Sequence, residues 1–230
     1  MKAVVFDFDG TLTKKGQNAW RTLWQFAGYT LDEASEYRTL FKKFMNREID
    51  HQTWCDLTCE CLKKSKLSEV AVLNLGAMME QIDGVHETLL TLKKKGYSLY
   101  IVSGSVKQMI NTCLKMDNIA LFDGIFANRF EYTNDGVLNK IVGTKFDFEG
   151  KRVFVEKLMQ EKNMSPEDIV FVGNSHNDEF VKACGVKTIC LNAEHTNAGN
   201  KNAWDLSIRA NNLTAILPYL TNATSAELIK

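Results

Sequence analysis

Two carboxylates stand at the end of the first apolar segment of the chain, in the run Asp7-Phe8-Asp9-Gly10-Thr11. Side chains alternate along an extended chain, so residues 7 and 9 would face the same side. Neighbouring carboxylates repel each other and usually need a cation or a shared proton. Magnesium is the natural cation, because it takes oxygen ligands and commonly binds carboxylates together with a substrate phosphate. An Asp-Gly pair alone would indicate only a turn, whereas the whole run after a buried strand is far more specific.

Two further apolar segments end in small polar residues. Ser103-Gly104-Ser105 follows the segment 98–102, and the run from Gly173 to Asp178 follows the segment 169–172. In a parallel α/β sheet, ligands bind outside the carboxyl ends of the strands. The three polar clusters are therefore expected to converge on one site.

The elements that carry these clusters alternate in type. After Asp83-Gly84, apolar strand-like segments are separated by helix-like segments of about ten residues, which favours a parallel sheet covered by helices on both faces. Gly96 is a good helix C-cap, and Asn134-Asp135-Gly136 is a hairpin turn signal. The expected strands cover 2–8, 98–102, 169–172 and 188–191, with short β segments within 122–142, and the expected helices cover 85–95, 106–116, 151–161 and 177–184.

Residues 14–82 have a different character. Glycine and β-branched residues are sparse there, and helix-like patches follow one another at 18–27, 31–45, 52–64 and 68–81. The pattern predicts an all-helical domain, residues 14–82, inserted into an α/β core domain formed by 1–13 and 83–230.

The whole chain resembles the haloacid dehalogenase-like hydrolase superfamily. Its Asp-x-Asp-x-Thr motif is matched by Asp7, Asp9 and Thr11, and its strand-end serine by Ser103 with Gly104. Its lysine at a helix start is matched by Lys151, and its acidic cluster by residues 173–178. The insertion lies where this superfamily places its first type of cap, and its size and helical content look most like the phosphoserine-phosphatase-like branch. The resemblance implies a Rossmann-like, three-layer core with a parallel sheet plus an inserted helical cap.

The resemblance also implies roles for the motif residues. Asp7 would be the nucleophile that forms an aspartyl-phosphate, and Asp9 would protonate the leaving oxygen and then activate water. The hydroxyl of Ser103, the amide of Gly104 and the amine of Lys151 would hold the phosphoryl oxygens. An acid at position 9 is needed for an alkoxide leaving group and not for a halide. The chain is thus expected to be a phosphatase of phosphate monoesters.

The cofactor implied by the resemblance is Mg²⁺, bound by the carboxylate of Asp7, the carbonyl of Asp9 and Asn174. Thr11, Asn177 and Asp178 would support the site, with Asp178 orienting Lys151 or a metal-bound water. The family usually has Asp where this chain has Asn174. An amide oxygen can still ligate Mg²⁺, so we expect weaker affinity with activity retained.

Other outcomes stay open from the sequence. Asp178 could take over the ligand role from Asn174, or the protein could be a catalytically weak phosphate-binding protein. A phosphoryl transferase or mutase would use the same aspartyl-phosphate intermediate.

A small phosphorylated molecule is the expected substrate, because caps of this type enclose small sites. Phosphoserine phosphatases bind the amino-acid head with a glutamate and an arginine, and the matching positions here fall near Gly16 and Thr58. Arg47 or Arg38 could compensate. Three tryptophans could form a cage for a quaternary ammonium or belong to the core: Trp20, Trp24 and Trp54.

Several other polar residues each allow a functional and a purely structural interpretation. His51, Cys55 and Cys59 would share one helix face and could hold a soft metal or simply be buried. His176 could be catalytic or a surface residue at a helix start. Lys14 and Lys15 could meet an anionic substrate or only solvent.

The composition limits the possible partners. Lys+Arg and Asp+Glu number 28 each, so there is no basic excess typical of a nucleic-acid binder. No apolar run approaches the roughly 20 residues that cross a bilayer, and a carboxylate at position 7 comes too early for a signal peptide. We expect a cytoplasmic protein with neither nucleic-acid nor membrane partners, and the sequence leaves its oligomeric state open.

Overall fold

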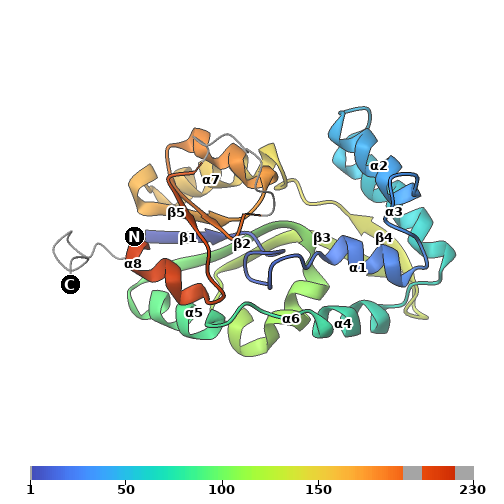
Figure 1. The fold of residues 1–230 in the computed structure, drawn as a ribbon, viewed down its shortest axis with the longest axis horizontal. Coiled ribbons are helices and arrows are strands. Elements are labelled where there is room, and N and C mark those ends of the chain that lie inside the picture. The colour runs from blue at the N-terminus through green and yellow to red at the C-terminus, as the bar shows by residue number, and fades with distance from the viewer. Residues whose placement is uncertain (1, 194–203, 221–230) are drawn as a thin grey trace.

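The computed structural model describes residues 2–193 and 204–220, and in this part of the chain seven strands form one sheet in the order β4-β3-β2-β1-β5-β6-β7 (Figure 1). All neighbouring strands are parallel except β3 and β4, which pair antiparallel at one edge. The strands are β1 Lys2–Phe6, β2 Tyr97–Val106, β3 Gly124–Tyr132, β4 Leu138–Val142, β5 Ile169–Gly173, β6 Lys187–Leu191 and β7 Leu206–Ile208.

Strand β1 is buried on both faces. Val4 and Phe6 pack into one hydrophobic cluster, while Ala3 and Val5 pack into a second cluster on the opposite side. This alternation explains why β1 is a continuous apolar run instead of an alternating one. Because β1 lies between β2 and β5, its carboxyl end lies at the centre of the sheet edge.

Helices cover both faces of the sheet and make three layers (Figure 1). The cluster around Val4 and Phe6 includes residues of α5 and α6, and the cluster around Val5 includes residues of α7. The core helices are α5 Val85–Lys94, α6 Lys107–Ile119, α7 Glu149–Lys162 and α8 Leu217–Leu220, with 3-10 helices η1 Pro166–Asp168, η2 His176–Cys184 and η3 Leu213–Ile216. The predicted α/β fold with a parallel sheet between helical layers is confirmed.

The segment 14–82 contains four α-helices: α1 Ala19–Phe26, α2 Glu36–Met45, α3 His51–Lys64 and α4 Glu69–Met78. Each starts after a residue whose side chain accepts a hydrogen bond from the backbone three residues on, which is the usual N-cap geometry; these caps are Asn18, Ser35, Asp50 and Ser68. The chain enters and leaves this segment at one place, because Thr13 pairs with Gln81 in an isolated bridge.

Helix α4 packs against the core helix α6. A Cβ atom on Gly76 would lie 2.6 Å from the Cα atom of Met109, so only glycine allows this close approach. Helix α3 packs instead against β4, where Gln52 donates to the carbonyl of Ile141. The helical segment thus contacts the core through both α3 and α4.

Some expected elements differ in extent. The predicted helix 31–45 begins only at Glu36, because Ser35 caps it. The predicted strand 98–102 continues to Val106, which pairs with Asn128 after a register shift. The predicted helix 177–184 is the 3-10 helix η2, opened by a capping box between Ser175 and Asp178.

Strand β7 was not predicted at all, because its three residues carry too little pattern. Among the helices in residues 2–193 and 204–220, none has the length and apolar character to span a bilayer.

Candidate active site

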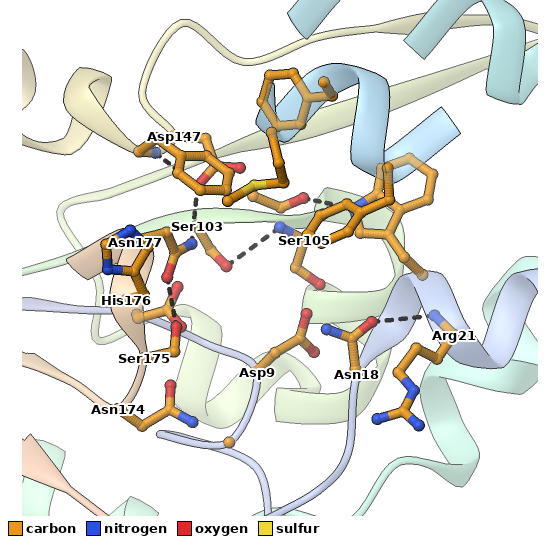
Figure 2. Close-up of a pocket in the computed structure, with 18 of the residues that line it drawn as sticks. Asp9, Asn18, Arg21, Ser103, Ser105, Asp147, Asn174, Ser175, His176 and Asn177 are labelled. Atoms are coloured by element: carbon orange, nitrogen blue, oxygen red, sulfur yellow. Dashed lines mark hydrogen bonds between the residues drawn. The ribbon is translucent and has the colours of Figure 1, made fainter. Parts of the chain in front are cut away.

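The carboxyl ends of β1, β2 and β5 meet in one pocket of about 350 Å³ (Figure 2). Asp7 and Asp9 follow β1, Ser103 lies near the end of β2, and Asn174 follows β5. Asp7, Ser103 and Asn174 are at most 5% exposed. The structure therefore brings the three polar clusters together, as the strand order requires.

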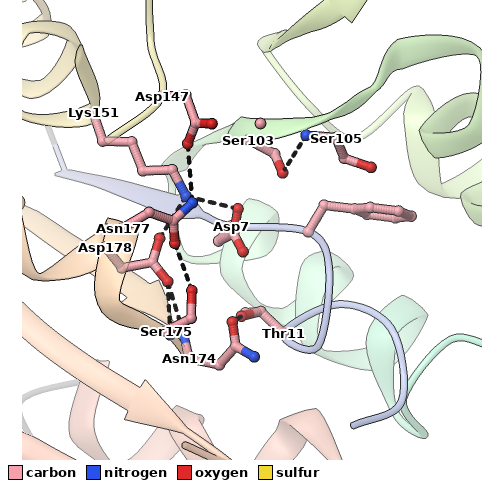
Figure 3. Close-up of polar contacts among 12 residues, drawn as sticks. Asp7, Thr11, Ser103, Ser105, Asp147, Lys151, Asn174, Ser175, Asn177 and Asp178 are labelled. Carbon is pink, nitrogen blue, oxygen red and sulfur yellow. Dashed lines mark hydrogen bonds and ion pairs between the residues drawn. The ribbon is translucent and has the colours of Figure 1, made fainter. Parts of the chain in front are cut away.

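Lys151 lies between two carboxylates beneath this pocket. Its Nζ atom is 2.8 Å from Oδ1 of Asp7 and 2.6 Å from Oδ1 of Asp178 (Figure 3). The other oxygen of Asp178 accepts hydrogen bonds from the backbone amides of Asn174 and Ser175. Asp178 thus fixes the lysine amine beside Asp7.

The charge of Lys151 is secured by its neighbours. Burial alone would lower the pKa of this fully buried amine, but the carboxylates of Asp178 and Asp7 raise it above its usual value. The lysine is the third residue of α7. The residue just before this helix, Phe148, has a φ of 48°, which is unusual for a residue other than glycine. Such backbone strain occurs where surrounding structure fixes a functional residue.

Asp9 is the acidic residue that faces the pocket next to Asp7. Its Oδ1 atom accepts a hydrogen bond from the amide of Ala19, the first residue of α1. Burial, reinforced by the charge of Asp7, raises the pKa of Asp9 to about 8. Asp9 therefore carries a proton at neutral pH and can donate it to a leaving oxygen.

The peptide between Gly104 and Ser105 is held on both sides. Its carbonyl accepts hydrogen bonds from Nε1 of Trp20 at 2.7 Å and from Nδ2 of Asn128 at 2.6 Å. Its amide, on Ser105, donates to Oγ of Ser103 at 3.2 Å. Because the Ser103 hydroxyl oxygen accepts this hydrogen bond, the hydroxyl proton of Ser103 is available for another acceptor.

Sequence reasoning missed two residues of this region. Asn128 is fully buried, and it also contacts Nε2 of His51 at 2.9 Å. The sequence signal that could have identified it is an asparagine within the strand β3. Asp147 packs so closely on Gly104 that a Cβ atom there would lie 2.2 Å from the Asp147 carboxylate.

The remaining motif residues support the β1 and β5 ends. The hydroxyl of Thr11 donates to Oδ1 of Asn174 at 3.3 Å. Gly10 has a φ of 73°, and a Cβ atom there would lie 2.3 Å from Nδ2 of Asn174, so both the turn and the close packing require glycine. Asn177 donates to Asp147 at 2.9 Å.

The donor atoms at Asp7, Asp9 and Asn174 suit a hard cation. All are oxygens, and among the described residues the carboxylates of Asp7 and Asp178 share one buried positive charge, the Lys151 amine. Within the described residues, no three His, Cys, Asp or Glu side chains are grouped as a metal centre. A cation here would thus depend on the Asp9 carbonyl and the Asn174 amide as well as on Asp7.

The other candidate residues have ordinary partners. His51 and Cys55 lie on the α3 face near Asn128, and Cys59 contacts the carbonyl of Asn139. His176 is exposed and contacts Glu179. Lys14 forms an exposed ion pair with Glu80, and Lys15 is exposed and not among the residues that line the pocket.

The positions expected to select the substrate are only partly at the pocket. Gly16 lines it, but Thr58 is fully buried in α3 away from it, and Arg47 pairs with Glu149. Arg38 lines the pocket. Of the three tryptophans, Trp20 and Trp54 line it, whereas Trp24 is buried outside it.

Known proteins share this architecture. A phosphoserine phosphatase of Archaeoglobus fulgidus is 26% identical over 95% of this chain, which spans 60% of that protein's length. A phosphoserine phosphatase of Methanocaldococcus jannaschii is also 26% identical, over 95% of this chain and 97% of its own. A solved structure of a substrate-bound phosphoserine phosphatase complex superposes with a TM-score of 0.74 at 25% identity, covering 96% of this chain and 98% of the other.

The family model of the haloacid dehalogenase-like hydrolases matches residues 1–179, which include the ends of β1, β2 and β5 and the lysine of α7. The chain therefore belongs to the haloacid dehalogenase-like hydrolase family, in its phosphoserine-phosphatase-like branch.

Proposed function

We propose that this protein is a Mg²⁺-dependent phosphatase that hydrolyses a small-molecule phosphate monoester through an aspartyl-phosphate on Asp7. The observation that carries the proposal is the buried triad of Asp7, Lys151 and Asp178 beneath a pocket that also contains Asp9 and Ser103. The named phosphoserine phosphatases among its relatives support a phosphatase.

In this mechanism, the Asp7 carboxylate attacks phosphorus while Asp9 gives its proton to the leaving oxygen. Asp9, now ionised, then takes a proton from the water that hydrolyses the aspartyl-phosphate. The Ser103 hydroxyl, the Gly104 amide and the Lys151 amine would hold the phosphoryl oxygens throughout. Asp7, the Asp9 carbonyl and Asn174 would hold Mg²⁺, which would supply charge neutralisation for the phosphoryl group.

The helical segment 14–82 acts as the cap in this proposal, with 1–13 and 83–230 as the core. Its side chains form one wall of the pocket, and α1 begins at the amide that binds Asp9. A cap over the site excludes water from the first chemical step and selects the alcohol of the ester. We retain the cytoplasm as the proposed location.

Hydrolysis of para-nitrophenyl phosphate by the purified protein tests the proposal. We expect release of nitrophenolate with Mg²⁺, none with a chelator, and loss of turnover in Asp7→Asn. Acid-quenched protein should carry a labile phosphoryl group that the Asp7→Asn variant lacks. Binding of inorganic phosphate without any turnover would instead identify a phosphate-binding protein, for which Asn174 gives a reason.

A further inference from the structure

Aromatic rings form a large part of the pocket wall. The rings come from α1, α2, α3 and the segment before α7, and belong to Trp20, Tyr37, Phe41, Phe44, Trp54 and Phe148. Phe44 lies at the centre of this wall, because its ring is 5.3 Å from that of Phe148 and 6.0 Å from that of Trp54. The ring of Trp54 is in turn 4.8 Å from that of Trp20.

The charges around this wall disfavour a cationic ligand group. Within the described residues, the acidic side chains that line the pocket are Asp7, Asp9 and Asp147. Asp7 and Asp9 are committed to the reaction, and Asp147 accepts hydrogen bonds from Asn177 and the amide of Phe148. An amino-acid or quaternary ammonium head would thus find, among the described residues of the pocket, no carboxylate without another role.

A positive charge at the pocket, on Arg21, also disfavours a cationic ligand group. Arg21 lines the pocket at its rim, and its guanidinium has no ion-pair partner in residues 2–193 or 204–220 (Figure 2). Gly16, also at the pocket, adds no side chain, and an added Cβ there would meet nothing within 4 Å. The head of the substrate therefore faces rings and two arginines, Arg21 and Arg38.

We propose that the alcohol part of the substrate is a planar aromatic ring, best with an anionic substituent that reaches Arg21, instead of an amino acid or a quaternary ammonium. The inference rests on the proposed phosphatase function. Ring–ring contacts add binding energy beyond the burial of apolar area. A cation–π cage would need the same rings but an electronegative surrounding, which Arg21 opposes.

Four esters with comparable alkyl leaving oxygens test the inference: benzyl phosphate, 4-carboxybenzyl phosphate, O-phosphoserine and phosphocholine. Acetyl phosphate, which has no ring, reports the phosphatase chemistry separately. We expect kcat/KM for benzyl phosphate to exceed that for O-phosphoserine and phosphocholine by about tenfold or more. The carboxylate should increase kcat/KM further, and Arg21→Met should remove that increase.

Two phenylalanine variants of the helical segment make a matched pair. Phe44→Leu should lower the ratio of benzyl to acetyl phosphate turnover by about tenfold. Phe26→Leu, at a 54% exposed ring outside the pocket, should leave the ratio unchanged. Circular dichroism and thermal melts show that both variants are folded.

The outcomes separate the two proposals. Asp7-dependent hydrolysis of acetyl phosphate with preference for O-phosphoserine or phosphocholine, or an unchanged ratio in Phe44→Leu, would overturn the aromatic substrate and leave the phosphatase standing. No hydrolysis of any of the five compounds by folded protein with Mg²⁺ would overturn both.

Discussion

At the scale of single residues, the site is a set of buried charges that depend on one another. The single positive charge of Lys151 is shared by the carboxylates of Asp7 and Asp178, and Asp178 in turn is anchored by two backbone amides. The arrangement keeps Asp7 close to a positive charge that also suits a phosphoryl oxygen. Such a group is costly to leave incomplete, because a buried charge without its partner is strongly destabilising.

Lys151→Met is expected to destabilise the fold as well as to abolish phosphate binding. Removing one member of a buried pair leaves the other uncompensated, at about 3–5 kcal/mol. Lys157→Met on the same helix is the control, because Lys157 pairs with Glu161 at the surface and should change stability by less than about 1 kcal/mol. Urea unfolding at neutral pH without Mg²⁺ measures both; equal effects would contradict the buried-charge account.

In the proposed mechanism, Asn174 would set the affinity for the metal. Asn174→Asp would add a negative charge to a set of oxygen ligands, and should lower the Mg²⁺ concentration for half-maximal activity by about tenfold. Calorimetric titration with Mg²⁺ alone separates affinity from turnover. An unchanged or weaker affinity would show that residue 174 does not contact the metal.

At the scale of elements, the end of strand β2 is positioned from two sides. Asn128 of β3 and Trp20 of α1 both donate to the Gly104 carbonyl, so a core strand and a helix of segment 14–82 orient the same peptide. That peptide binds Oγ of Ser103 through its amide. Helix α1 therefore contacts the proposed phosphate-binding residues although it contributes none of them.

Trp20→Phe tests this positioning role. The variant keeps an aromatic ring and removes the donor to Gly104, so the inhibition constant of inorganic phosphate should rise about fivefold, as expected for one hydrogen bond. Trp54→Phe is the matched control, because the buried Nε1 of Trp54 has no hydrogen-bond partner within the described residues. If both variants bind phosphate equally, the contact from Trp20 is only structural.

At the scale of the whole molecule, the helical segment is fastened to the core around the pocket. Thr13 pairs with Gln81 where the chain enters and leaves, and Arg47 of this segment forms an ion pair with Glu149 of α7. These contacts connect the segment to the run after β1 and to the start of α7, which both carry site residues. Ligands of the site are thus expected to stabilise the entire fold.

Mg²⁺ should raise the unfolding midpoint of the protein. A ligand that binds only the folded state stabilises it by about 2.7 kcal/mol at a hundred times its dissociation constant, and here it would also add positive charge beside the Asp7 carboxylate. Thermal melts with Mg²⁺ and with sodium chloride of equal ionic strength measure this effect. We expect a smaller shift for Asp7→Asn, and a shift equal to that of sodium chloride would contradict the cation site.

The sequence by itself determined the fold class and most of the polar residues at the strand ends. Asp7, Ser103 and Asn174 each follow an apolar run, which the local pattern shows. Their meeting at one site then follows from the rule that parallel strands present their carboxyl ends at one edge of the sheet. The extent of β2 and the 3-10 form of η2 could not be predicted, because they depend on pairing with β3 and on the Asp178 side chain.

Only the tertiary structure decided what surrounds the Asp7-Phe8-Asp9 run. Asn128 and Asp147 are far from it in sequence, and neither they nor the nearer Trp20 have a spacing that marks them. The rings of the pocket wall likewise come from four separate segments. Nothing in the sequence distinguishes Trp24, which is buried outside the pocket, from Trp20, which lines it. Local sequence fixes which side chains a strand or helix presents, whereas their common pocket depends on how those elements pack.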